Sequence, residues 1–146
     1  MIGSVYLKEG ARMPEYADEG SSGADLFALT DKDIVLLSGE FKTINTGVYV
    51  DIPQGNEIQI RPRSGLAAKN GITVLNTPGT IDSSYRGEIK IILINLSKRT
   101  FVVTNHMKIA QMVGASIEKL NLIKKDSLDE LSKTERGEGG FGHTGV

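Results

Sequence analysis

Apolar and polar residues alternate along much of the chain, in short runs separated by turn-forming residues. The clearest run covers residues 41–52 and stops at Pro53-Gln54-Gly55, a sequence that favours a turn. Alternation with this period is typical of β-strands. Further strands are predicted at 56–61, 72–75, 88–95, 100–104 and 108–116, with shorter ones near Val5, Asp25 and Ile34. This spacing predicts an all-β fold of the sandwich, barrel or jelly-roll type.

The segment 88–95 differs from the other predicted strands. It begins with the alternating residues Glu88-Ile89-Lys90 and continues as the apolar run Ile91-Ile92-Leu93-Ile94. A continuous apolar run is typical of a strand that is buried on both faces. We therefore expect both faces of this strand to be buried, with a subunit interface as one source of the second face.

Helical patterns are few and short. Residues 64–71 predict a helix of about one or two turns, because Ser64 can cap its start and Asn70-Gly71 favours a left-handed stop. A second helical stretch is predicted at 127–133. Beyond it, five of the last ten residues are glycine, and such a segment cannot bury enough surface to offset its ordering entropy. The sequence thus predicts a core at 1–125 and a flexible glycine-rich arm at 126–146.

Composition and charge exclude several classes of function. A length of 146 residues suits one domain. The chain has 17 basic and 18 acidic residues and a net charge of −1, so any site that binds a polyanion must be a local cluster of positive charge. The absence of cysteine excludes disulfides, thiolate zinc sites and cysteine nucleophiles. No apolar run is long enough to cross a bilayer, and no secretory pattern opens the chain. We expect a cytoplasmic protein with no nucleic-acid or membrane partner.

The tripeptide Arg63-Ser64-Gly65 is the first candidate site. It places a guanidinium, a hydroxyl and an unobstructed backbone at the predicted helix start, where free N–H groups and the helix dipole favour an anion such as phosphate. The alternative is that Ser64 only caps the helix, while Arg61 and Arg63 form surface ion pairs.

The segment 79–88 is the second candidate, because a hairpin there can project Asp82 into a cleft. A carboxylate in a cleft can act as a general base on water, but an aspartate in a turn can instead bind backbone donors. Tyr85 is either a pocket wall or an ordinary hairpin aromatic. Asn76 either reads an amide-bearing ring by hydrogen bonds or is simply a turn residue.

Two polar residues interrupt predicted apolar strands. Asp25 lies within the apolar segment 23–28, and a buried acid needs a partner, either an arginine in a structural ion pair or a hydrated cation. Gln111 lies within 108–116, where its amide either donates to a phosphate oxygen or faces solvent.

Taken in order along the chain, these motifs resemble the five motifs of the homotrimeric deoxyuridine triphosphate pyrophosphatases (dUTPases). The matching segments, which span nearly the whole chain, are 23–28, 61–67, 79–87, 108–111 and 136–145. The resemblance implies a β-jelly-roll or distorted-barrel homotrimer with one short helix, which hydrolyses dUTP to dUMP and pyrophosphate with Mg²⁺. It also implies that each site combines residues of three subunits, so that an isolated monomer is inactive.

The resemblance further implies roles for single residues. Asp82 would deprotonate the water that attacks the α-phosphorus, Tyr85 would pack under the deoxyribose, and Asp25 would reach Mg²⁺ through its water shell. Uracil would be read by Asn76, Gly79 and Ile81, and the phosphate chain would be held by Arg63, Ser64, Gly65 and Gln111. In the arm, Arg136 would meet the γ-phosphate and Phe141 would stack on uracil, and the closing segment would be completed by Gly142, His143 and Thr144.

Two positions depart from the common pattern of this family. Ser84 stands where the third motif often carries a second aspartate, and His143 stands where many members have serine. Protonation of His143 would then tune a phosphate contact near neutral pH. Two other functions remain as alternatives: a dCTP deaminase-like enzyme of the same fold, and a non-catalytic regulatory module that binds nucleotides.

Overall fold

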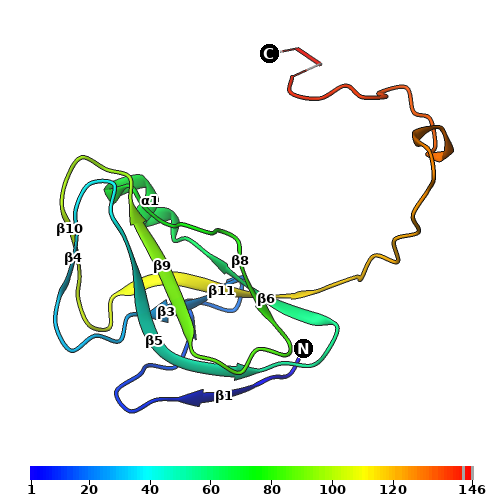
Figure 1. The fold of residues 1–146 in the computed structure, drawn as a ribbon. Coiled ribbons are helices and arrows are strands. Elements are labelled where there is room, and N and C mark those ends of the chain that lie inside the picture. The colour runs from blue at the N-terminus through cyan, green and yellow to red at the C-terminus, as the bar shows by residue number, and fades with distance from the viewer. Residues whose placement is uncertain (143, 146) are drawn as a thin grey trace.

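The computed structural model describes residues 1–142, 144 and 145, and its strands form two antiparallel sheets and a two-stranded ribbon (Figure 1). The first sheet has the order β1-β5-β9-β7, with strands Ser4–Leu7, Phe41–Asp51, Ile89–Asn95 and Ile72–Val74. The second has the order β2-β3-β11-β6-β8, with strands Glu15–Tyr16, Ala24–Phe27, Lys108–Ser116, Asn56–Arg61 and Gly79–Asp82. The ribbon pairs β10 (Phe101–Val103) with β4 (Ile34–Leu36). The fold is an all-β jelly roll with one short helix, as predicted.

One hydrophobic core joins the two sheets, and the alternation of the strands selects its residues. The fully buried side chains come from both sheets and include Leu26, Ile44, Ile91, Leu93 and Ile109. The predicted strands at 41–52, 56–61 and 108–116 are confirmed to within one residue at each end. In β5, β6 and β9 the buried side chains mostly recur at every second position, whereas β3 and β11 also bury adjacent residues.

Within the single chain, the strand predicted at 88–95 is buried on one face, and burial of its second face by a subunit interface stays a prediction. On the inward face of β9, Ile89, Ile91 and Leu93 are fully buried. On the outward face, Ile92 and Ile94 are only half-buried. The core of one chain therefore covers one face of this strand.

Two strands lack a clear signal in the sequence. β2 has only two residues, and β8 occupies the start of the segment predicted as a hairpin loop. Gly79 and Asp82 are residue types that favour turns, but β8 pairs with β6 along its whole length, with Asp82 opposite Glu57. This long-range pairing overrides the local preference. Since β8 is the edge strand of its sheet, Asp82 lies at the end of an edge.

The predicted short helix is confirmed as α1 (Ser64–Asn70), although its start differs from the prediction. Gly71 adopts the left-handed conformation, with φ 64° and ψ 27°, and ends the helix as expected. The predicted cap at Ser64 is wrong, because the residue at the N-cap is Arg63 and no side chain makes a capping bond. A capping serine must precede the first helical residue, and Ser64 lies one residue too late.

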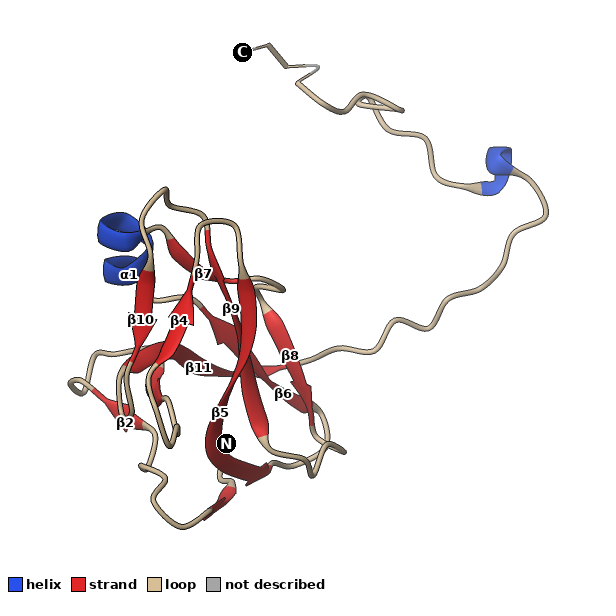
Figure 2. Ribbon diagram, turned by 60° about the vertical axis from the view of Figure 1, so that its left-hand side comes forward, coloured by secondary structure: helices blue, strands red, loops and turns tan. Residues whose placement is uncertain are grey.

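The prediction of a second helix at 127–133 is also wrong, since only a 3₁₀ turn, η1 (Leu128–Glu130), forms there. All its residues are exposed, and a short helix without tertiary packing is not stable. The barrel ends at Ile117, whose N–H donates to the carbonyl of Gly55 at 3.0 Å. Residues 118–138 are exposed, and the segment runs away from the barrel (Figure 2). Within the described residues, no helix has the length and apolar content needed to cross a membrane.

Candidate active site

The first cleft lies where β3, β11 and the start of α1 meet, and we call it the Arg63 cleft. It encloses about 270 Å³ and is lined by Ala17, Ser21, Ser22, Gly23, Asp25, Arg63, Ser64, Gly65 and Gln111. Three segments that are far apart in the sequence, 23–28, 61–67 and 108–111, thus contribute to one cavity. Antiparallel pairing of β11 with both β3 and β6 brings them together, because Gln111 lies opposite Asp25 on one side and Arg61 on the other.

Asp25 is the buried acid of this cleft, and its partners are two cations. Its Oδ1 accepts from Arg63 Nε at 3.0 Å, and its Oδ2 forms an ion pair with Lys108 Nζ at 2.9 Å. The Asp25 side chain is only 12% exposed, which makes such pairing necessary. The predicted partner arginine is therefore present, whereas sequence reasoning missed Lys108, although this lysine begins the segment 108–111.

Gln111 does not face solvent as an ordinary strand glutamine does. Its Nε2 donates to the carbonyl of Pro62 at 3.0 Å. A side chain at Gly23 would collide with the Gln111 amide, so the absence of a Cβ at Gly23 makes room for it. Gln111 thus connects β11 to the segment before α1 and lies in the wall of the Arg63 cleft. Arg61 lies outside this wall and binds Gln59 Oε1 through Nη2 at 2.6 Å.

A second cleft, the Asp82 cleft, lies between β8 and β9. It encloses about 230 Å³ and is lined by Thr80, Ile81, Asp82, Tyr85, Glu88 and Lys90. The turn after β8 is closed by the Asp82 carbonyl, which accepts the N–H of Tyr85 at 3.0 Å. Among the described residues, no turn donor binds the Asp82 carboxylate, so the structure does not support the view that this group serves only to stabilise the turn. The carboxylate is exposed and can meet a water molecule.

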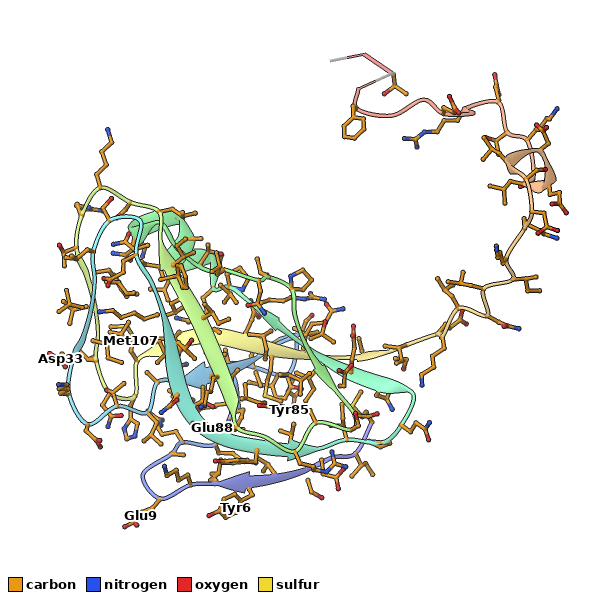
Figure 3. The ribbon with its side chains drawn as sticks, in the orientation of Figure 1. Tyr6, Glu9, Asp33, Tyr85, Glu88 and Met107 are labelled. Atoms are coloured by element: carbon orange, nitrogen blue, oxygen red, sulfur yellow. The ribbon has the colours of Figure 1, made fainter. Side chains whose placement is uncertain are left out.

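Tyr85 has a fixed orientation within this turn. Its hydroxyl donates to the carbonyl of Glu88 at 2.9 Å (Figure 3). A side chain at Gly87 would collide with the phenol of Tyr85, so the ring lies against the backbone where no Cβ is present. Tyr85 therefore forms a wall of the Asp82 cleft while 42% of the residue stays exposed.

Asn76 and Gly79 lie together at the start of β8. A Cβ at Gly79 would be 3.3 Å from Asn76 Nδ2 and 3.3 Å from Ile60 Cβ, so the amide of Asn76 faces the Gly79 backbone. Ile81, two residues further along β8, packs against the core and lines the Asp82 cleft. The residues expected to read a base thus occupy one strand and the turn that precedes it.

Asp82 and the Arg63 cleft lie at different places on the second sheet. Asp82 pairs with Glu57 on β6, whereas Gln111, in the Arg63 cleft, pairs with Arg61. Four strand residues separate these positions, which corresponds to roughly 13 Å along the strand. One chain therefore does not bring the Asp82 carboxylate to Arg63.

The arm residues lie away from both clefts in the single chain. Arg136 binds within the arm, where its Nε donates to the carbonyl of Gly139 at 2.8 Å. Phe141 is fully exposed and has a φ of 48°. Gly142 and Thr144 belong to the same exposed end of the arm, and His143 lies outside the described residues.

The ligands available for a metal ion are few. Among the described residues, no three His, Cys, Asp or Glu side chains gather as a metal site. Asp25 is the carboxylate of the Arg63 cleft, and its two ion pairs leave lone pairs that can accept hydrogen bonds from water. A divalent ion in this cleft would therefore take most of its ligands from a bound anion and from water.

Comparison with known proteins gives a consistent result. A family model described as dUTPase matches residues 9–145. The chain is 54% identical over 136 residues to the deoxyuridine 5'-triphosphate nucleotidohydrolase of Alkaliphilus metalliredigens. The aligned residues make up 93% of this chain and 91% of that protein. It is similar to the dUTPase of Staphylococcus bacteriophage 80alpha with dUPNHPP, at 28% identity and a TM-score of 0.84 over 99% of each chain. It is also similar to a mutant dUTPase from phage phi11 of S. aureus that coordinates a structural Mg(II) ion, at 25% identity and a TM-score of 0.78 over 88% of this chain and 99% of that one.

Proposed function

The chain belongs to the dUTPase family and hydrolyses dUTP to dUMP and pyrophosphate, and we propose that Asp82 activates the attacking water while the Arg63 cleft holds the phosphates. The observation that carries this proposal is the exposed carboxylate of Asp82, which lines one cleft together with Tyr85 and Ile81. Phosphoryl transfer needs positioning, charge stabilisation and one base, and these two clefts offer all three.

Asp82 acts as the general base in this proposal. Its carboxylate takes a proton from water, the water oxygen bonds to the α-phosphorus, and the bond from that phosphorus to the bridging oxygen breaks to release pyrophosphate. Tyr85 supports the deoxyribose, while Asn76, Gly79 and Ile81 read the uracil. Lack of space in the hairpin excludes the methyl group of thymine.

The phosphate chain lies in the Arg63 cleft in this proposal. Arg63, Ser64, Gly65 and Gln111 all line that cavity, which supports their assignment as phosphate ligands. Mg²⁺ would be held by phosphate oxygens and water, with Asp25 accepting hydrogen bonds from that water, and it would offset charge on the leaving pyrophosphate. The pairs of Asp25 with Arg63 and Lys108 fit an outer role for this carboxylate better than direct ligation.

The arm closes the site in this proposal. Arg136 meets the γ-phosphate, Phe141 stacks on the uracil, and the segment of Gly142, His143 and Thr144 completes the closure. The exposure of Phe141 and of the whole segment 118–138 supports this view, because none of these side chains is committed to the barrel. Closure would exclude water other than the reacting molecule.

The functional unit is a homotrimer in this proposal, and each site takes residues from different subunits. The separation of Asp82 from the Arg63 cleft within one chain supports this sharing, since one chain cannot complete the site alone. Apolar side chains that one chain leaves exposed or half-buried also support assembly, among them Ile92, Ile94, Leu120, Leu122 and Ile123. A cytoplasmic location stays a prediction.

The test of the reaction is pyrophosphate release from dUTP, compared with dTTP, UTP and dCTP, with and without Mg²⁺. We expect release from dUTP that depends on Mg²⁺, and little from the others. Asp82→Asn should reduce kcat by roughly a hundredfold or more while nucleotide binding is largely kept. Asp33→Asn, at an exposed aspartate on another loop, serves as the control (Figure 3). Near-normal turnover in Asp82→Asn would exclude this base, and ammonia release from dCTP would indicate a deaminase.

The test of the shared site mixes two inactive variants, Asp82→Asn and Arg63→Ala, under conditions that allow subunits to exchange. If one subunit supplies Asp82 and another supplies Arg63, random mixing restores about a quarter of the sites. Activity should therefore appear on mixing. Persistent inactivity of assembled mixed trimers would show that both residues act from one chain.

A further inference from the structure

The turn from Asp82 to Glu88 carries the base and the sugar-binding tyrosine, yet its own strand holds it weakly. β8 pairs with a single neighbour, β6, because it is the edge of its sheet. Asp82 is the last residue of that strand. Edge strands and the turns that follow them are more mobile than central strands, so contacts outside β8 decide how firmly the turn is held. At its far end, Glu88 Oε1 accepts from the N–H of Gly47 in β5 at 2.8 Å.

Arg86 provides further contacts within the turn. Its Nη1 donates to the carbonyl of Ser83 at 2.7 Å and to the carbonyl of Tyr85 at 3.0 Å. These carbonyls belong to the residues directly after the base and at the sugar-binding position. The planar guanidinium therefore fixes the shape of the turn between Asp82 and Tyr85.

Asp51 connects this turn to the opposite sheet. Arg86 Nη2 donates to Asp51 Oδ1 at 2.7 Å. Asp51 ends β5, a strand that has β1 on one side and β9 on the other. Asp51 itself is paired with Ser4 of β1, so the guanidinium joins the edge of one sheet to the end of a long strand in the other.

Because this contact is exposed, its effect on the position of the turn can be distinguished from its effect on folding stability. The side chains of Arg86 and Asp51 are 56% and 62% exposed. Exposed ion pairs add little to folding stability. Neither residue lines the Asp82 cleft, so neither is placed to touch the reacting atoms.

We infer that Arg86 and Asp51 act together as positioning residues, which hold Tyr85 in place relative to the Asp82 carboxylate. This inference rests on the proposed roles of Asp82 and Tyr85. A displacement of about 1 Å within a catalytic site can reduce turnover by up to a hundredfold, so loosening this exposed contact should affect kinetics more than stability.

The experiment compares Asp51→Ala, Arg86→Ala and the double variant with the wild-type protein. Asp51→Ala should lower kcat for dUTP about tenfold and reduce the preference for dUTP over UTP, because Tyr85 shifts. The melting temperature should stay within about 2 °C, and the assembly state should not change. Because Asp51 acts through Arg86, the double variant should be no slower than Arg86→Ala alone.

Conservative variants sharpen the result. Asp51→Asn keeps an oxygen that can accept from Arg86, so its kcat should recover to within about threefold of wild type. Arg86→Lys keeps the charge but not the planar fork, so it should stay as slow as Arg86→Ala. Glu40→Ala breaks a half-buried ion pair elsewhere, with Lys42 at 3.4 Å, and should leave kcat unchanged.

Each contrary outcome overturns the inference. Wild-type kinetics in Asp51→Ala would show that the contact does not position Tyr85. If the losses of kcat in the two single variants multiply in the double variant, Asp51 acts separately from Arg86. A fall in melting temperature or loss of assembly that parallels the loss of kcat would assign the pair a structural role. Turnover retained in Asp82→Asn would instead refute the proposed base, which keeps the two failures distinct.

Discussion

Replacement of Asp25 by asparagine tests the charge arrangement of the Arg63 cleft. The amide has nearly the same shape as the carboxylate but carries no charge. Its oxygen can still accept from Arg63 Nε, while its NH₂ group would face the ammonium of Lys108, donor against donor. The ion pair with Lys108 is therefore lost, and a buried position gains an unfavourable contact.

The magnitude follows from the burial of the three side chains. A hydrogen bond to a charged group contributes about 1.5–3 kcal/mol. The side chains of Arg63 and Lys108 are 34% and 38% exposed, so the released cations recover part of their hydration and the loss is reduced. We expect Asp25→Asn to lower the free energy of unfolding by about 1–3 kcal/mol. For a chain of this size, the melting temperature should fall by roughly 3–10 °C.

The assay is thermal unfolding at one fixed subunit concentration, since assembly raises apparent stability with concentration. Asp33→Asn serves as the exposed control. The double variant Asp25→Asn with Lys108→Met removes the unpaired ammonium and should be less destabilised than the two single effects combined. An unchanged melting temperature in Asp25→Asn, together with a raised Mg²⁺ requirement, would refute the ion-pair reasoning and assign Asp25 to the metal alone.

Three further predictions concern glycines and the arm. Gly87→Ala would displace the Tyr85 ring, so the ratio of kcat/KM for dUTP to that for UTP should fall while the melting temperature changes little. Gly47 has a φ of 67°, and a Cβ there would lie 2.7 Å from both Ala11 Cβ and Leu29 Cδ2, so Gly47→Ala should cost about 2–4 kcal/mol in urea unfolding. Deletion after Lys133 should leave a folded trimer by circular dichroism and size-exclusion chromatography, with severely reduced turnover; loss of assembly would show that the arm is structural.

Much of the fold is predictable because strand periodicity is a local property. The run at 56–61 alternates and forms β6 as expected, and the largely apolar run at 108–116 forms β11. β8 was not predictable in this way, because its residue types favour a turn and its pairing with β6 is a non-local contact. The cap at Ser64 failed for a related reason, since a shift of one residue at a helix start changes which side chain can reach the first N–H groups.

The candidate site is also only partly predictable from the sequence. Residue types identified Asp25, Arg63 and Gln111 as polar groups that need partners, and the structure brings them into one cleft. The role of Lys108 could not be predicted, because it depends on which oxygen of Asp25 remains open after Arg63 binds. The separation of Asp82 from that cleft depends on strand register, which residue types alone do not give.

The exit of the chain from the barrel at Ile117 has a kinetic consequence. A flexible tether of about 25 residues spans roughly 25–30 Å on average, so the aromatic end of such a tether samples a small volume around its attachment point. A group confined in this way has an effective concentration in the millimolar range, whatever the dilution of the enzyme. The capture of nucleotide by this segment would thus be a first-order event. The length and the stiffness of the tether would set its rate, without any change in the contacts that the segment makes.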